Sequence, residues 1–259
     1  MFGTNFKSGL RGMAVAIAIA APLALAPGAK AANVGLELSL LIDVSGSVSD
    51  DQYALQRGGY VSAFQNAAVQ AAIFGSVSGS IAVNFIVWSG GGQQSEAVGW
   101  SLIDDVASAN AFAALVAAVP RTFSGLTAPG SAINFAVPLF TANTFDAPRQ
   151  VIDVSGDGAE NDGADTSDAR DAALAAGIDT INGIAIGGDP DVTAFYLANI
   201  AGGTNSFVIT AASFAEFEGA IQEKLIKEIT PVPEPASLIL FGFGLAALGV
   251  ARRRFNRAA

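Results

Sequence analysis

The chain has 259 residues, with 23 acidic and 13 basic side chains, and it contains neither His nor Cys. Without Cys there are no disulfides or thiolate metal sites, and without His there are no Ser-His or Cys-His triads and no usual zinc sites. Residues 32–235 hold all 23 acids and only six basic residues, a net charge of −17, which argues against nucleic acid as a partner. Because His and Cys are absent, any bound metal must be held by oxygen ligands.

The N-terminus has the pattern of an export signal. Basic residues Lys7 and Arg11 precede an uncharged apolar run from Met13 to Ala26, and Ala29-Lys30-Ala31 offers a cleavage site. This order is typical of a secretory signal peptide. We assign residues 1–31 to it and expect the mature chain to begin at about Ala32.

The first strand of the mature chain is predicted over Glu37–Asp43, and it is apolar enough to be central and parallel. It runs into Asp43-Val-Ser45-Gly-Ser47, after which Ser49 and Gln52 form a capping box for a helix. A buried strand that ends in oxygen donors indicates either an N-capping loop or a site for a hard divalent cation.

Strands then alternate with helices, apart from one hairpin. Further strands are predicted at 80–88, 97–103, 150–155, 180–186 and 206–210, and helices beginning near 108, 131, 166, 189 and 213. The second and third strands should form the antiparallel hairpin, and Gly58-Gly59 should weaken the first helix. The pattern predicts an α/β fold over residues 32–229: a doubly wound, mostly parallel six-stranded sheet with one antiparallel edge strand and helices on both faces.

Two of the predicted strands end in Asp-containing loops, at Asp43 and Asp157. Ligands of open α/β sheets bind beyond the carboxyl ends of the strands, where the strand order reverses. If these strands are neighbours, Asp43, Ser45, Ser47 and Asp157 converge, and Thr127 from the loop before a helix completes the set. Two carboxylates and three hydroxyls suit an octahedral site for Mg²⁺ or Mn²⁺.

Other acids lie near this set. Glu160, Asp162 and Asp165 do not fit the spacing of an EF-hand, and we expect a solvated loop. Asp153 lies within a buried strand, where we expect a structural hydrogen-bond acceptor.

The motif residues resemble the metal-ion-dependent adhesion site of von Willebrand factor A domains, which reads Asp-x-Ser-x-Ser, then a Thr, then Asp-Gly. The resemblance spans about residues 35–229 and points to a bacterial branch of uncharacterised function. It implies that Ser45, Ser47 and Thr127 bind a divalent cation directly, Mg²⁺ first, with Mn²⁺ or Ca²⁺ as alternatives. Asp43 and Asp157 would act through water, and a partner's acidic group would fill the open position. The last segment of the motif is usually Thr-Asp-Gly, whereas this chain has Ser155-Gly156-Asp157-Gly158, which is one residue longer. Asp153 is therefore the alternative to Asp157.

The C-terminus combines a Pro-rich linker (230–235), an uncharged apolar run (236–251) and a cluster of Arg residues (252–257). It resembles the PEP-CTERM sorting signal, and we assign residues 230–259 to it. The resemblance implies a Gram-negative exporter, transient anchoring in the membrane through 236–251, cleavage by an exosortase and a link to exopolysaccharide or biofilm. A plain membrane anchor is the alternative.

Three functions follow as hypotheses. The first is an exported, surface-associated adhesion module that grips an acidic group of a protein or matrix partner. The second is a metal-dependent hydrolase, which we do not favour because there is no His base and no second Asp at position 45. The third is a structural matrix protein with a vestigial metal site.

Overall fold

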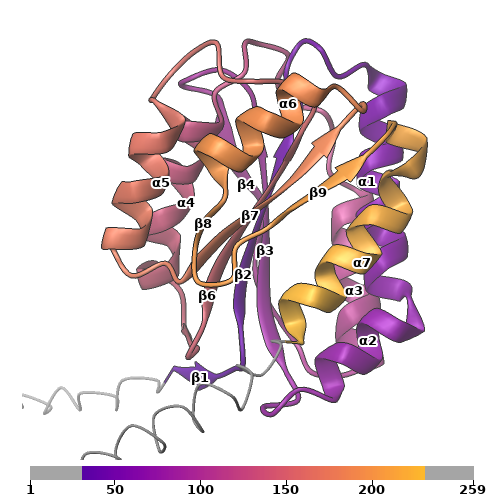
Figure 1. The fold of residues 1–259 in the computed structure, drawn as a ribbon. Helices are drawn as coiled ribbons and strands as arrows, with labels where there is room; N and C mark the ends of the chain where they lie inside the picture. The colour runs from indigo at the N-terminus through magenta and orange to yellow at the C-terminus, as the bar shows by residue number, and fades with distance from the viewer. Residues whose placement is uncertain (1–30, 231–259) are drawn as a thin grey trace, which may run out of the picture. The chain divides into compact units, whose positions relative to one another are not determined.

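A seven-stranded sheet runs through the middle of the protein, with helices against both of its faces (Figure 1). The computed structural model describes residues 31–230. Apart from one residue each, the predicted signal peptide and the predicted tail lie outside this part. Within residues 31–230 no helix is long and apolar enough to cross a membrane, and the apolar run 236–251 lies outside the described residues.

The sheet has the order β4-β3-β2-β6-β7, with β8 and β9 both beside β7. Its strands are β2 (Glu37–Asp43), β3 (Ile81–Trp88), β4 (Gln94–Ile103), β6 (Gln150–Gly156), β7 (Thr180–Ile186), β8 (Gly202–Gly203) and β9 (Val208–Ala211). A separate parallel pair joins β1 (Ala32–Asn33) to β5 (Phe145–Asp146).

The predicted α/β fold with a mostly parallel sheet is confirmed, but the prediction of six strands is wrong. The additional strand, β8, pairs antiparallel with Thr180 and Ile181 at the start of β7. Antiparallel pairing therefore occurs at β8 as well as at β4. A strand of two glycines has no side chains that could alternate between faces, so the sequence pattern does not reveal it.

Helices connect the strands. They are α1 (Asp50–Gln65), α2 (Ala67–Phe74), α3 (Val106–Ala117), α4 (Pro129–Ala142), α5 (Thr166–Ala175), α6 (Pro190–Phe195) and α7 (Phe217–Ile229). A π-helical turn, Tyr196–Ile200, continues α6, and a 3-10 turn, Phe214–Glu216, precedes α7.

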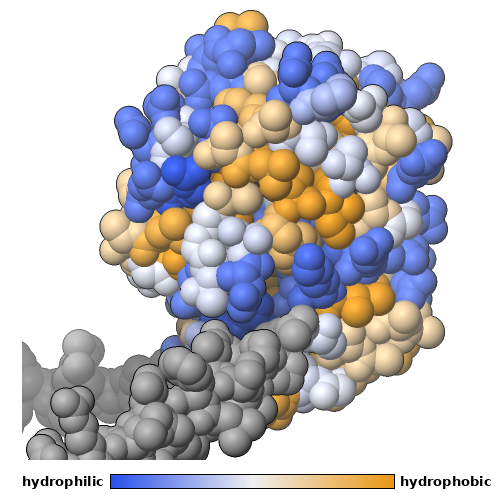
Figure 2. Space-filling view, in the orientation of Figure 1, coloured by the Kyte–Doolittle hydropathy of each residue, from blue (hydrophilic) through white to orange (hydrophobic). Residues whose placement is uncertain are grey.

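Two apolar cores lie on the two faces of the sheet. Leu40 and Ile42 of β2 point into the core that α1, α2, α3 and α7 cover, whereas Leu41 points into the core under α4, α5 and α6. Every residue of β2 is buried, as expected for a central parallel strand covered on both faces. On the surface, hydrophobic residues gather on the side where β9 forms the edge of the sheet, with hydrophilic residues around them (Figure 2).

The end of α7 meets the start of β2. Ile229 and Thr230 line a groove of about 520 Å³ together with Val34, Gly35 and Leu36. This groove lies at the amino ends of the parallel strands. The described chain therefore ends at the pole of the domain opposite to Asp43.

A pair of glycines in α1 gives matched substitutions. A Cβ on Gly59 would lie 2.7 Å from Phe217 Cδ1 of α7, whereas a Cβ on Gly58 would meet nothing within 4 Å. We expect Gly58→Ala to raise the free energy of unfolding by about 0.5–1 kcal/mol, through helix propensity. Gly59→Ala should lower it by about 1–3 kcal/mol, because the methyl group forces α1 and α7 apart. Urea denaturation of both variants measures these effects, and equal effects at the two positions would contradict this packing.

Candidate metal centre

The five predicted metal ligands come from three loops at one edge of the sheet. Asp43 is the last residue of β2, Ser45 and Ser47 follow it, Thr127 precedes α4, and Asp157 follows β6. β2 and β6 pair in parallel, so their carboxyl ends lie side by side, which is the condition under which the sequence predicts that these residues converge. The loops that carry the ligands therefore meet where the strand order reverses.

The side-chain oxygens of four of these residues form one connected group. Ser47 Oγ donates to Asp157 Oδ1 at 2.6 Å. Ser45 Oγ lies 3.2 Å from Ser47 Oγ, and Thr127 Oγ1 donates to Ser45 Oγ at 3.5 Å. Asp43 fixes the backbone of the loop that carries Ser45, since its Oδ1 accepts from the backbone N–H of Ser45 at 2.7 Å.

Asp43 gives the site an unbalanced negative charge. Its side chain is fully buried, and within residues 31–230 its Oδ2 has no hydrogen-bond partner. Burial raises the pKa of Asp43 to about 7, hydrogen bonds from Ser45 and from the backbone of Asp157 oppose the shift, and the negative charge of Asp157 adds to it. A buried carboxylate with one oxygen that accepts no hydrogen bond would be stabilised by a nearby cation or by a further hydrogen-bond donor.

These residues fit a hard divalent cation. Every side-chain ligand in this group is a carboxylate or hydroxyl oxygen. Ser45 is buried and Ser47 is exposed, so the group is accessible to solvent on the side of Ser47. Within residues 31–230 there is no group of three or more acidic side chains that could hold a metal ion. A cation at this position would therefore take most of its ligands from hydroxyls.

Asn161 holds Thr127 in place, a role that the sequence did not reveal. Its side-chain oxygen accepts from the backbone N–H of Thr127 at 2.8 Å, and its own backbone N–H donates to the carbonyl of Thr127 at 3.0 Å. These two contacts join the loop after β6 to the loop before α4. The loop that carries Asp157 therefore also positions Thr127.

The acidic loop after Asp157 is more than the solvated segment we expected. Asp162 Oδ2 accepts from the backbone N–H of Gly91 at 2.7 Å, which connects this loop to the β3–β4 turn. Glu160 and Asp165 accept from backbone N–H groups in the first turn of α5. The carboxylates satisfy N–H groups that would otherwise lack partners.

Arg121 fixes the backbone beside the motif serines. Its Nη2 donates to the carbonyl oxygen of Ser45 at 2.8 Å and to that of Val44 at 3.3 Å. Its Nη1 pairs with Asp50 at 2.9 Å. The guanidinium thus links the loop after β2 to the start of α1 through its fork of donors.

Asp153, the alternative ligand, lies elsewhere. It is fully buried on the face of the sheet that α7 covers, and its Oδ1 contacts Lys224 Nζ at 2.5 Å. The same Nζ contacts Glu228 Oε1 at 2.5 Å, and Asn182 Nδ2 donates to that Oε1 at 2.8 Å. The structure therefore places Asp157, and not Asp153, beside the motif hydroxyls.

The buried cluster of Asp153, Lys224 and Glu228 predicts a pH dependence. Burial raises the pKa of Asp153 to about 7, Lys224 opposes the shift, and Glu228 adds to it. The folded state thus keeps a proton that the unfolded chain releases near pH 4. Stability should fall as pH rises from about 4 to about 7 and then level off, with Asp153 contributing up to about 1.4 kcal/mol per pH unit and Asp43 adding its own contribution in the same interval.

Urea denaturation in a chelator at several pH values measures this dependence. In Glu228→Gln, Asp153 faces Lys224 without a second carboxylate, and the slope in this interval should become smaller. Stability that rises steadily from pH 4 to pH 7 in the wild type would contradict the prediction.

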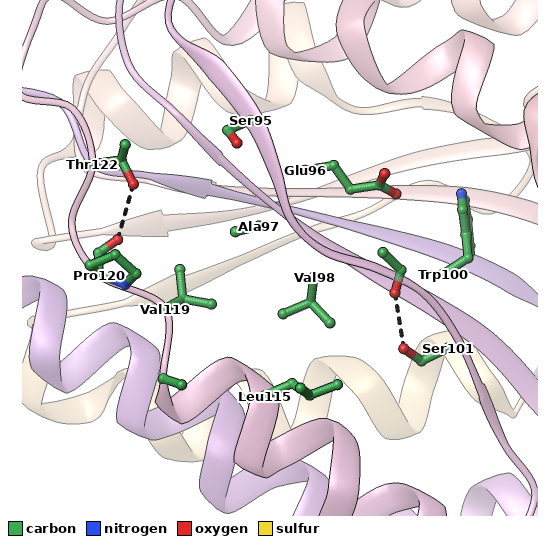
Figure 3. A pocket seen from close by; sticks show the side chains of 12 residues that line it. Ser95, Glu96, Ala97, Val98, Trp100, Ser101, Leu115, Val119, Pro120 and Thr122 are labelled. Atoms are coloured by element: carbon green, nitrogen blue, oxygen red, sulfur yellow. Dashed lines mark hydrogen bonds between the residues drawn. The ribbon is translucent and has the colours of Figure 1, made fainter.

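A groove of about 660 Å³ runs along the edge strand β4, outside the candidate metal centre (Figure 3). Glu96, Val98 and Trp100 of β4 line it, with Leu115 of α3 opposite and Thr122 at one end. None of the five predicted ligands lines this groove.

Sequence comparisons identify two regions. A family model described as "Protein of unknown function (DUF1194)" matches residues 33–233, and the PEP-CTERM protein-sorting motif matches residues 231–254. No curated protein matches the chain.

Solved structures share the fold of the domain. Proximal thread matrix protein 1 from the mussel byssus is 16% identical, with a TM-score of 0.54 over 76% of this chain and 48% of that chain. The pilus adhesin SpaC from Lactobacillus rhamnosus GG is 15% identical, with a TM-score of 0.53 over 76% of this chain and 30% of that one. A von Willebrand factor type A structure from Catenulispora acidiphila is 16% identical, with a TM-score of 0.53 over 76% and 43%.

This chain thus spans less than half the length of each of these three proteins. A further structure of the mussel protein is described as having a zinc-occupied MIDAS motif. At these identities the similarity shows the fold alone, which is that of a von Willebrand factor A domain.

Proposed function

The chain belongs to the DUF1194 family and carries a PEP-CTERM motif, and from this premise we propose that it is an exported, surface-associated binding protein. It would use a divalent cation to grip an acidic group of a protein or matrix partner. The observation that carries the proposal is the convergence of Asp43, Ser45, Ser47, Thr127 and Asp157 at one edge of the sheet. Two similar folds support it: one described as a pilus adhesin and one with a metal in this motif.

Mg²⁺ is the cation we propose first. Hydroxyl and carboxylate oxygens are hard ligands, and a site with few charged ligands and solvent access suits an ion that keeps some of its water. Ser45, Ser47 and Thr127 would hold the ion, and Asp43 and Asp157 would balance its charge. The bound ion would supply a Lewis-acidic position for a carboxylate oxygen of the partner. Mn²⁺ and Ca²⁺ are the alternatives.

The sorting motif supports export. A PEP-CTERM motif implies an exported protein of a Gram-negative bacterium with a membrane-associated tail that an exosortase recognises. With a signal peptide over residues 1–31, the domain would reach the cell surface or the medium, and residues 236–251 would anchor it until cleavage. A role in exopolysaccharide or biofilm matrix belongs to the same proposal.

Calorimetric titration of the purified protein with Mg²⁺, Mn²⁺ and Ca²⁺ tests the cation. We expect uptake of one ion by the wild type and none by Asp43→Ala, with Asp51→Ala as the control, because Asp51 is exposed on α1. If the wild type takes up none of the three ions, the proposal is wrong.

Capture of surface material tests the partner. The protein should retain acidic proteins or matrix components in Mg²⁺ and release them in chelator, and Asp43→Ala should capture none. Equal capture with and without chelator would instead favour a structural matrix protein with a vestigial site.

We also propose that the protein is not an enzyme. The chain has no His that could act as a general base, so we expect phosphatase and esterase screens in Mg²⁺ to stay at background. Turnover that Asp43→Ala abolishes would make the metal-dependent hydrolase the better reading.

A further inference from the structure

Tyr196 is a buried tyrosine whose hydroxyl has no explained role. It begins the π-helical turn after α6, its side chain is 0% exposed, and within residues 31–230 its hydroxyl has no hydrogen-bond partner. A buried tyrosine hydroxyl nearly always finds a partner, so one left alone requires an explanation. π-helical turns also occur often at functional sites.

An unsatisfied acceptor of the candidate metal centre lies close to this hydroxyl. A Cβ on Gly156 would lie 2.6 Å from the Tyr196 hydroxyl and 2.7 Å from Asp43 Oδ2. The Tyr196 hydroxyl and Asp43 Oδ2 therefore lie on either edge of one small space beside Gly156, the last residue of β6. Asp43 Oδ2 is also buried without a hydrogen bond within residues 31–230. An unpartnered donor thus lies close to an unpartnered acceptor.

Two glycines on adjacent strands admit the tyrosine ring. A Cβ on Gly183 of β7 would lie 2.7 Å from Tyr196 Cδ1, and one on Gly156 would meet the hydroxyl. Gly183 pairs with Val154, two residues before Gly156 on β6. The ring therefore occupies the space that the absence of side chains at Gly183 and Gly156 leaves beside Asp43. This also explains the unusual Ser155-Gly156-Asp157 segment, because any side chain at position 156 would fill the space.

We propose that Tyr196 is a positioning residue of the metal centre: its hydroxyl donates to Asp43 Oδ2, directly or through one water, and so orients the carboxylate toward the cation. The inference rests on the proposed function. An ionised carboxylate oxygen accepts two hydrogen bonds, so this contact leaves a lone pair of Oδ2 for a metal-bound water. The Ser45 N–H and the Tyr196 hydroxyl would then each hold one of the two oxygens of Asp43. Groups that orient ligands in this way typically contribute 10–100-fold to metal affinity.

The first test is Mg²⁺ titration calorimetry on Tyr196→Phe, which keeps the ring and removes only the hydroxyl. We expect Mg²⁺ affinity to fall about 10–100-fold. Tyr60→Phe is the matched control, because Tyr60 is also fully buried but donates to Ser155 Oγ on the other face of the sheet. Its affinity should stay within about twofold of the wild type. Unchanged affinity in Tyr196→Phe, with normal uptake by the wild type, overturns the inference and leaves the proposed function standing.

The second test needs no metal. A double-mutant cycle of Tyr196→Phe with Asp43→Asn, measured by urea denaturation in chelator, reports whether the two side chains interact. We expect a coupling of at least about fivefold in the unfolding equilibrium constant. Additive effects overturn the inference whether or not the wild type binds metal. Coupling together with no metal uptake by the wild type would retain the Tyr196–Asp43 contact and reject the proposed function.

Discussion

Lys224→Met should lower the free energy of unfolding by about 3–5 kcal/mol, the largest stability effect expected of one substitution in this domain. Lys224 is 0% exposed and its Nζ contacts Asp153 and Glu228 at 2.5 Å each. Methionine fills similar space but leaves two buried carboxylates without a positive charge. Without Lys224, which opposes the raised pKa of Asp153, protonation of Asp153 becomes part of the cost of folding, so the loss should be larger at pH 8 than at pH 5.

Two further variants test whether the loss of stability comes from the unpaired buried charges. Lys227→Met changes an exposed lysine on the same helix that lies over the Phe207 ring at 3.7 Å, and it should cost about 0.5–1 kcal/mol. Combining Lys224→Met with Asp153→Asn and Glu228→Gln should recover much of the lost stability, because no unpaired buried charge remains. A loss that is equally large in the triple variant would mean that packing, and not charge, holds α7 on the sheet.

Asp43→Asn should have opposite effects with and without metal. Asparagine keeps an oxygen that accepts from the Ser45 N–H and removes a buried negative charge whose second oxygen has no partner in the described residues. In chelator we expect the variant to be more stable than the wild type by about 1–3 kcal/mol. In Mg²⁺ at about 1,000 times the Kd of the wild type the order should reverse, because the wild type then gains about 4.1 kcal/mol from binding.

Thermal or urea unfolding of both proteins in chelator and in Mg²⁺ checks this reversal. Asp51→Asn, at an exposed position, should show neither effect. If Asp43→Asn destabilises the chelated protein even in a Tyr196→Phe background, where the tyrosine hydroxyl is absent, other parts of the fold satisfy the buried carboxylate and it needs no cation. This result would be evidence against the metal centre.

The sequence predicted the fold class, and it predicted which hydroxyl and carboxylate side chains lie together at one edge of the sheet, because both depend on local patterns. Alternating buried strands and helices indicated a mostly parallel sheet. The short spacing of Asp43, Ser45 and Ser47 after a buried strand indicated the first loop of the site. The parallel pairing of β2 with β6 then brought Asp157 to the same edge.

Long-range contacts explain what the sequence did not reveal. Asn161, Arg121 and Tyr196 act on the site through hydrogen bonds or packing from other loops and helices, and no local pattern distinguishes them from surface or core residues. The sequence indicated a structural role for Asp153 but not its partner, because Lys224 lies 71 positions later in the sequence. The Gly58-Gly59 pair indicated a weak helix, but Gly59 is needed for close contact with Phe217.

The position of Thr230 beside the start of β2 sets how the domain would stand on a membrane. β2 has seven residues, so roughly 20 Å separate the groove at Thr230 from Asp43. This distance exceeds two Debye lengths at physiological ionic strength, and the potential of an anionic bilayer decays within about one. If the segment after Thr230 anchors the domain with this pole toward the bilayer, the proposed cation would lie beyond the reach of the lipid charge, and the affinity for Mg²⁺ should be the same before and after release.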